Sequence, residues 1–295
     1  GAGDGTVKTR ADGKEGVFFN AVLSRFPNEY KDIPYIEYDN IKDPFLKKDA
    51  RFQAWILYPD SQFRGQTIKI QGGMIHPDGK ATLWVEDSET IDGKKYYSFG
   101  APTGNVSGFF NYENKMAGNT VTTGFSMRKF LDPSSFQLYH KTFWYDIRYA
   151  EILLSYAEAV VESGQGDKAR AKQYLNDIRH RAAFKDDVEL TLENVLHQRE
   201  LEFAFEGDQL YTLHRRRAFY NKLTDNDVQG QKHALTPVID LRGGTPKYIF
   251  VRSIHYAEDP LTGGKASDYH TAPKSYYGRI SDFGVNKYEP NPADE

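Results

Sequence analysis

The 295-residue sequence contains no cysteine, which excludes disulfide bonds, thiolate metal ligands and a cysteine nucleophile within it. It also lacks any apolar run of the roughly 20 residues that a membrane-spanning helix requires. Residues 1–6 have neither the basic region nor the apolar region of a secretory signal. An export signal and a lipid-bearing cysteine, where they exist, are therefore expected upstream of this sequence.

The sequence also has little excess of one sign of charge. The sequence has 38 Lys and Arg against 41 Asp and Glu, a formal net charge of -3. Such a chain has no global attraction to phosphate backbones or anionic lipids, so nucleic acid is not an expected partner. The one dense basic run, Arg215–Arg217, falls at the expected end of a helix, where it complements the helix dipole.

Aromatic residues are abundant, with 20 Tyr, 19 Phe and 3 Trp making up 14% of the chain. Most of them are expected to fill the core, because aromatic side chains dominate core energetics. Those that reach the surface are rigid, flat and apolar, and such faces stack well on the C–H surfaces of sugar rings. With 39% hydrophobic residues, the chain is long enough to form one large domain or two small ones.

Residues 1–145 are expected to form a loop- and strand-rich region. Weak alternation predicts a buried strand over 51–58, and further short strands are predicted over 67–70 and 81–85. The turn sequences Pro77-Asp78-Gly79 and Asp92-Gly93 flank the last of these, which indicates a hairpin that carries Trp84.

From Asp146 onward the periodicity becomes helical, and two antiparallel helix pairs are predicted within residues 146–222. Gly164-Gln165-Gly166 is expected to end the first helix, and Asp167 is expected to cap the second. The third helix is expected to start at Thr191, and a fourth is expected from about Asp208 to Tyr220. The expected inward-facing positions are Ile147, Ala150, Leu154, Ala157 and Val161, then Ala171, Tyr174, Leu175, Ile178 and Ala182, then Leu192, Val195, Leu196, Arg199 and Phe203.

The predicted fold class is mainly α, in the α+β sense, with tetratricopeptide-like helix pairs, long irregular loops and short β-hairpins. Residues 223–295 return to loops, with a short strand over 247–251, and are expected to pack on the helices. The three regions 1–145, 146–222 and 223–295 are the expected domain organisation.

Three segments of the helical region together resemble the SusD/RagB family. They are residues 148–159 (RYAEILLSYAEA), 175–182 (LNDIRHRA) and 198–207 (QRELEFAFEG). Residues 48–52 (KDARF) and 123–130 (TGFSMRKF) are similar to two further family motifs in the same order, although Ala50 replaces the usual proline. The resemblance covers about residues 20–255, so the N-terminal half of the family is expected to be absent from this sequence.

The resemblance implies a function without catalysis. SusD-like proteins capture oligosaccharides at the bacterial surface and form a lid over a SusC-like TonB-dependent transporter in the outer membrane. A lipid anchor outside this sequence is then the expected membrane attachment. Two alternatives stay open, a RagB-like subunit that captures peptides and a structural helical-repeat adaptor. The arginines and glutamates of the motifs are expected to form buried ion pairs that fix helix packing.

Enzymatic and metal chemistry find little support. Glu202 and Glu206 lie four residues apart on one helix and could face the same way, but carboxylates at this spacing are expected to be solvated or paired with arginines. Glu151 and Glu158 are interpreted in the same way. The histidines are dispersed, and residues 225–236 begin like a calcium loop but end in Thr236 where a bidentate Glu is required. No catalytic residue, metal site or cofactor is therefore expected.

A sugar site should combine exposed aromatic side chains with planar polar groups, often on loops. Trp84 is the first candidate, because charged residues surround it in sequence. Trp55 and Trp144 border predicted buried elements and are expected to belong to the core. The full set of candidate ligand-binding residues is Trp84, Tyr96, Tyr97, Tyr30, Tyr35 and Tyr38.

Overall fold

The computed structural model describes residues 7–13, 18–20, 32–68, 70, 73–83, 88–97, 108–109, 120–121, 125–134, 142, 144–218 and 233–254. The chain forms two compact units. We call one the helical unit, which includes Phe45–Ile56 and Met127–Arg216, and the other the sheet unit, which comprises Val7–Pro44, Leu57–Ser126 and Arg217–Glu295. Across the described ranges, no helix is both long and apolar enough to cross a membrane.

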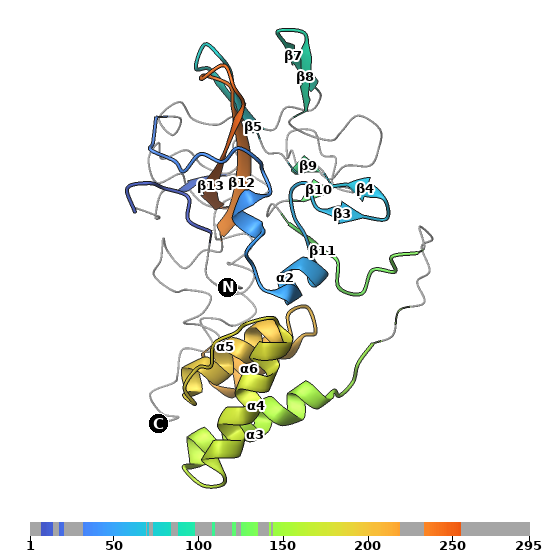
Figure 1. The fold of residues 1–295 in the computed structure, drawn as a ribbon, viewed down its shortest axis with the longest axis vertical. Coiled ribbons are helices and arrows are strands. Elements are labelled where there is room, and N and C mark those ends of the chain that lie inside the picture. The colour runs from blue at the N-terminus through green and yellow to red at the C-terminus, as the bar shows by residue number, and fades with distance from the viewer. Residues whose placement is uncertain are drawn as a thin grey trace, which may run out of the picture. The chain divides into compact units, whose positions relative to one another are not determined.

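The helical unit is built from α2 (Ala50–Trp55), α3 (Tyr149–Ser163), α4 (Lys168–Arg181), α5 (Leu192–Glu202) and α6 (Asp208–Arg215) (Figure 1). The predicted helix boundaries are mostly confirmed. Gly164 ends α3 in the left-handed conformation with φ 68°, and the side chains of Asp167 and Thr191 cap α4 and α5 by accepting from Arg170 N and Asn194 N.

The core of the helical unit forms where α3 packs against α4 and α5. Leu154 and Phe203 are both buried, as the prediction of packed helices requires. Small residues lie where α3 and α4 approach, because Ala157 and Ala171 are completely buried. The buried members of this core are Ala150, Leu153, Leu154, Ala157, Val160, Ala171, Leu175, Ile178, Val195 and Phe203.

Two details of the helix prediction were wrong. Ile147 precedes α3 and is 73% exposed, so it does not belong to the buried stripe, which begins at Ala150. The fourth helix ends at Arg215 and not near Tyr220, which lies outside the described residues. Arg217, just after that end, has φ 52°, a conformation that cannot continue a right-handed helix.

The predicted strand over 51–58 was also wrong, because most of it is helix α2. The Asp49 side chain accepts from Phe52 N and so caps this helix, which begins at Ala50. Only β2 (Ile56–Leu57) is extended. The alternation that predicted a strand was weak and had apolar residues on both sides, a pattern that cannot distinguish a buried strand from a buried helix.

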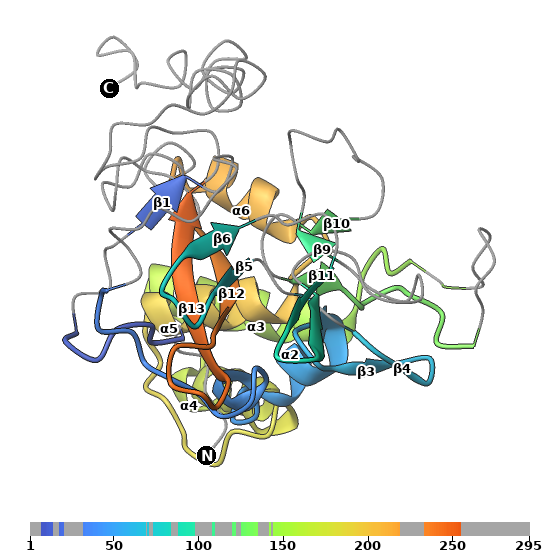
Figure 2. The same ribbon diagram turned by 90° about the horizontal axis from the view of Figure 1, so that it is seen from above.

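The sheet unit contains a five-stranded sheet in the order β1-β13-β12-β5-β6 (Figure 2). Its centre is the antiparallel hairpin of β12 (His233–Asp240) and β13 (Lys247–Ile254), which confirms and extends the strand predicted over 247–251. The strand β5 (Gly73–Ile75) runs parallel to β12, and β1 (Phe18–Asn20) runs parallel to β13.

Short hairpins occur where the turn sequences predicted them. β5 turns back into β6 (Ala81–Leu83) around Pro77-Asp78-Gly79, with His76 N donating to Lys80 O at 2.8 Å. Asp92 and Gly93, with φ 51° and 75°, form the turn between β7 (Ser88–Ile91) and β8 (Lys94–Tyr97), as a tight hairpin requires.

The remaining elements are short. β3 (Gln62–Phe63) pairs with β4 (Gln66–Thr67), so among the described residues of the strand predicted over 67–70, only Thr67 belongs to an observed strand. The others are η1 (Asp43–Phe45), β9 (Gly108–Phe109), β10 (Thr120–Val121) and β11 (Ser126–Met127).

The core of the sheet unit is apolar. Met74, Ile75, Val238, Phe250 and Val251 are completely buried. The mixture of helices with short strands agrees with the predicted α+β class. The tetratricopeptide-like relation between the two helix pairs stays a prediction.

Candidate functional site

A buried carboxylate, that of Glu202, lies at the C-terminal end of α5, and its side chain is 0% exposed. Arg148 donates to it from Nη1 at 2.6 Å, and Arg51 from Nη1 at 3.3 Å. Arg181, at the end of α4, donates to it as well. Three cations from sequence-distant segments therefore surround one anion, which compensates for its loss of hydration.

Glu206 extends this cluster of charges. Its carboxylate accepts from Arg148 Nε at 2.8 Å and from Lys129 Nζ at 2.5 Å, and Lys129 also donates to the Ala204 carbonyl at 2.9 Å. Burial alone would raise the pKa of Glu206, but the hydrogen bonds from Arg148 and Lys129 prevail and lower it. Burial lowers the pKa of Lys129 despite its contact with Glu206.

These contacts confirm the expected ion pairs of the family-like motifs. A carboxylate that serves as a general acid needs a raised pKa, and one that serves as a nucleophile needs access to substrate. Glu202 is sealed from solvent, and the pKa of Glu206 is lowered. We assign both side chains to the scaffold. We call the set Asp49, Arg51, Lys129, Arg148, Arg181, Glu202 and Glu206 the Glu202 cluster.

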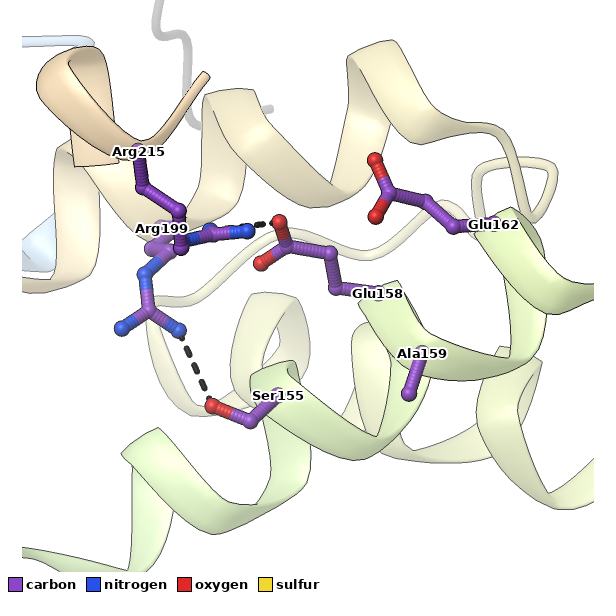
Figure 3. A pocket seen from close by; sticks show the side chains of 6 residues that line it. All are labelled: Ser155, Glu158, Ala159, Glu162, Arg199 and Arg215. Atoms are coloured by element: carbon purple, nitrogen blue, oxygen red, sulfur yellow. Dashed lines mark hydrogen bonds and ion pairs between the residues drawn. The ribbon is translucent and has the colours of Figure 1, made fainter.

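A second set of ion pairs surrounds an open pocket of about 240 Å³ in the helical unit (Figure 3). Arg199 on α5 donates to both oxygens of Asp208, at 2.6 and 3.0 Å, and to Ser155 Oγ at 3.1 Å. Arg215 Nη2 lies 2.6 Å from Glu158 Oε1. The lining residues are Ser155, Glu158, Ala159, Glu162, Arg199 and Arg215.

The pocket presents polar groups of both signs, but most of them already have partners. Glu158 is buried and is held by Arg215 and Arg216, and Arg216 also contacts Glu162. The pocket is smaller than the roughly 300 to 1,000 Å³ of a typical small-molecule site. It can hold one small polar group, and the more exposed Glu162 and Arg215 are the side chains best placed to bind it.

The predicted aromatic ligand-binding residues are placed only in part. Trp84 and Tyr30 lie outside the described residues. Tyr96 and Tyr97 belong to β8, in register with Glu89 and Ser88 of β7.

Tyr35 and Tyr38 both belong to the sheet unit, where one is buried and the other is half-buried. Tyr35 is buried, its hydroxyl has no hydrogen-bond partner among the residues that the structure describes, and burial raises its pKa. Tyr38 is half-buried, its ring lies edge to face with that of Phe250 at 5.8 Å, and its hydroxyl donates to the Lys8 carbonyl at 3.2 Å. Of the two, only Tyr38 has surface that a ligand can contact in this conformation.

The expectation that Trp144 belongs to the core was wrong, because its side chain is 61% exposed. Trp55 is half-buried at the end of α2, with Lys129 Nζ 3.6 Å from its ring centroid. The sequence reading also did not single out Tyr149 and Tyr211, which are 71% and 75% exposed.

Among the residues with described positions, no group of three or more His, Cys, Asp or Glu is arranged to hold a metal ion. The calcium-loop-like segment 225–236 and the histidines His255 and His270 lie wholly or largely outside the described ranges. The expectations about these residues stay predictions.

A sequence model of the SusD family matches residues 8–245, which is most of the chain. The chain therefore belongs to the SusD family. Members of this family are generally non-catalytic nutrient-binding proteins and are typically outer-membrane lipoproteins. Neither a curated protein nor a solved structure matches the chain.

Proposed function

We propose that this chain captures oligosaccharides at the bacterial cell surface and delivers them to a SusC-like TonB-dependent transporter in the outer membrane, without cleaving them. The match to the SusD family over residues 8–245 is the observation that carries this proposal. The charged residues of the motifs support it indirectly. Because the Glu202 cluster is engaged within the scaffold, ligand binding falls to side chains outside these motifs.

The proposed ligand contacts all belong to the same unit of the chain. All six fall in chain segments of the sheet unit, whereas the family-like helical motifs fall in the helical unit. This division suits a scaffold that carries a separate binding surface. The six are Trp84, Tyr96, Tyr97, Tyr30, Tyr35 and Tyr38, with Trp84 first, between β6 and β7 in the chain. Because Tyr35 is buried in this conformation, it is the weakest of the six.

Titration calorimetry with the purified chain, after a glycan array has selected the oligosaccharide, tests this function. We expect binding with unchanged chain length of the recovered sugar, since no cleavage is proposed. Trp84→Ala should weaken binding by about 1 to 3 kcal/mol, the range for losing one stacked aromatic face. Release of new reducing ends by the pure protein would contradict non-catalytic capture, and unchanged affinity in Trp84→Ala would remove Trp84 from the site.

Peptide capture is the second candidate, and the pocket of Figure 3 is what favours it. Its two more exposed charged residues, Glu162 and Arg215, have opposite signs, which suits one charged terminus of a peptide better than a neutral sugar. A parallel titration with a mixed hexapeptide library separates the two. Binding of peptides with no binding on the glycan array would favour peptide capture, and binding of neither would favour a structural adaptor.

A further inference from the structure

Trp144 occupies an unusual position for the largest aromatic side chain. Its indole is 61% exposed, in the segment that leads into α3, and the next residue, Tyr145, is 46% exposed. Leaving so much apolar surface in water is unfavourable, and tryptophan is highly buried on average. The ring is nevertheless not loose, because it lies on Phe130 with ring centroids 5.1 Å apart and an interplanar angle of 31°.

Phe130, on which the Trp144 ring lies, is held in place by the backbone of its segment. Phe130 has φ 69°, a left-handed conformation that bulky residues rarely adopt. Arg128 N and Lys129 N both donate to the Trp55 carbonyl, at 2.7 and 3.1 Å, and these bonds anchor the segment just before Phe130. Backbone strain of this kind persists where the surroundings impose it, and it concentrates at ligand sites.

The segment that carries Phe130 is joined to the interior of the helical unit through Lys129. Its ammonium lies 3.6 Å from the Trp55 ring centroid and 5.8 Å from that of Phe130, and it is bound to Glu206 at 2.5 Å. Because that ammonium is already paired, it offers little attraction to an anionic ligand. What this surface offers is a flat, rigid, uncharged aromatic face.

Such a face matches one class of ligand group. A pyranose ring with equatorial hydroxyls, as in glucose or xylose, presents its axial C–H bonds as a flat apolar surface. Stacking that surface on a fixed indole costs little conformational entropy, because the ring beneath has been positioned before the ligand arrives. A charged or strongly bent group would gain less.

We propose that Trp144, supported by Phe130, is a stacking platform for one neutral pyranose ring of the captured oligosaccharide. This inference rests on the proposed glycan-binding function. It adds a contact in the helical unit, outside the six candidate residues of the sheet unit.

The test uses cellohexaose, xylohexaose and maltohexaose as probes, measured by titration calorimetry on the full chain. Trp144→Ala should weaken binding of the preferred sugar about 5- to 150-fold, the equivalent of one lost stacking face. Trp144→Phe should recover part of the affinity. Tyr211→Ala is the matched control, since Tyr211 is a 75% exposed aromatic residue of the same unit, and it should leave affinity within about twofold.

The failures are distinguishable. If the wild-type chain binds a sugar and both Trp144 variants bind it equally well, the platform is refuted while glycan capture stands. If Tyr211→Ala loses as much affinity as Trp144→Ala, the loss is not specific to the platform, and the inference is again refuted. If the wild-type chain binds none of the three probes and nothing on a glycan array, the proposed function fails, and this inference fails with it. The conservative Trp144→Phe, checked by its thermal midpoint, decides the matter if the alanine variant does not fold.

Discussion

The helical unit and the sheet unit each bury a carboxylate, but they compensate for it in different ways. In the helical unit, Glu202 is fully enclosed and accepts from three arginines that lie 21, 54 and 151 residues away in the chain. In the sheet unit, Asp240 is nearly as buried, yet its main cation is Arg242, two residues away and 35% exposed. One arrangement joins distant segments and the other stabilises a single turn.

This difference indicates which interactions determine the packing of each unit. A buried ion pair adds little net stability compared with a well-packed apolar pair, because desolvation offsets the attraction. Removing one partner, however, is costly, since the other charge stays buried without compensation. The Glu202 cluster therefore forms a junction between α2, α4 and α5, and separating any of these helices would leave buried charge without compensation. The sheet unit instead relies on apolar strand residues such as Val238 and Phe250.

The largest expected effect tests that junction. Glu202→Gln should destabilise the helical unit by up to about 3 to 5 kcal/mol, because it removes one of the two carboxylates that contact each of Arg51 and Arg148, whose other partners are Asp49 and Glu206. Asp240→Asn should cost clearly less, since Arg242 can turn toward water. Urea unfolding followed by circular dichroism at 222 nm measures the first, and the fluorescence or exchange protection of the β12–β13 hairpin measures the second.

Two results would break the comparison. Equal losses of unfolding free energy in Glu202→Gln and Asp240→Asn would mean that a buried carboxylate is stabilised equally by arginines distant in sequence and by one nearby. A negligible loss in Glu202→Gln, with the exposed Glu193→Gln as its control, would mean that the three arginines are solvated or paired elsewhere.

The apolar part of the helical unit should produce a similar or slightly smaller effect. Leu154 is completely buried between α3 and its neighbours, so Leu154→Ala should cost about 2 to 5 kcal/mol, the usual range for emptying a buried leucine position. Ile152→Ala on the same helix is the control, because Ile152 is exposed and should lose little. Both are measured by the same urea transition. A loss in Ile152→Ala as large as that in Leu154→Ala would show that the exposed face of α3 is covered in solution.

The helices could be predicted from the sequence because their signals are local. The periodicity of Ala150, Leu154 and Ala157, the cap Asp167, the helix start at Thr191 and the break at Gly164 are all signals that act within a few residues. The same reasoning failed for α2, whose short sequence alternates weakly and is decided by the cap Asp49.

The candidate site was harder to predict, for a physical reason. The family resemblance, together with the cost of burying an unpaired charge, predicted that the arginines and glutamates of the motifs pair. The sequence could not show which arginine pairs with which glutamate, because the partners of Glu202 come from three separate segments. Trp144 was misplaced for a related reason, since proximity in sequence to buried helix α3 says nothing about which way a loop side chain faces.

The smallest expected effect is a pH dependence that separates the two parts of the Glu202 cluster. Hydrogen bonds from Arg148 and Lys129 hold the pKa of Glu206 below its ordinary value of 4.5, even though burial opposes them. A carboxyl whose pKa is lowered by folding contributes stability that is fully present above its unfolded pKa and is lost as the pH falls through its folded pKa. The contribution of Glu206 should therefore be constant from pH 7 to about 5 and should decline below about 4.5.

Glu206→Gln removes this titration, so the variant should be less stable than the wild type at pH 7, and the difference should shrink toward pH 3. Urea midpoints at pH 7, 5, 4 and 3 measure it, with the exposed Glu193→Gln as the matched control. A difference that stays constant over the whole range would mean that Glu206 stabilises the helical unit through packing and not through its charge. The hydrogen bonds to Arg148 and Lys129 would then be incidental to stability, and the junction would depend on Glu202 alone.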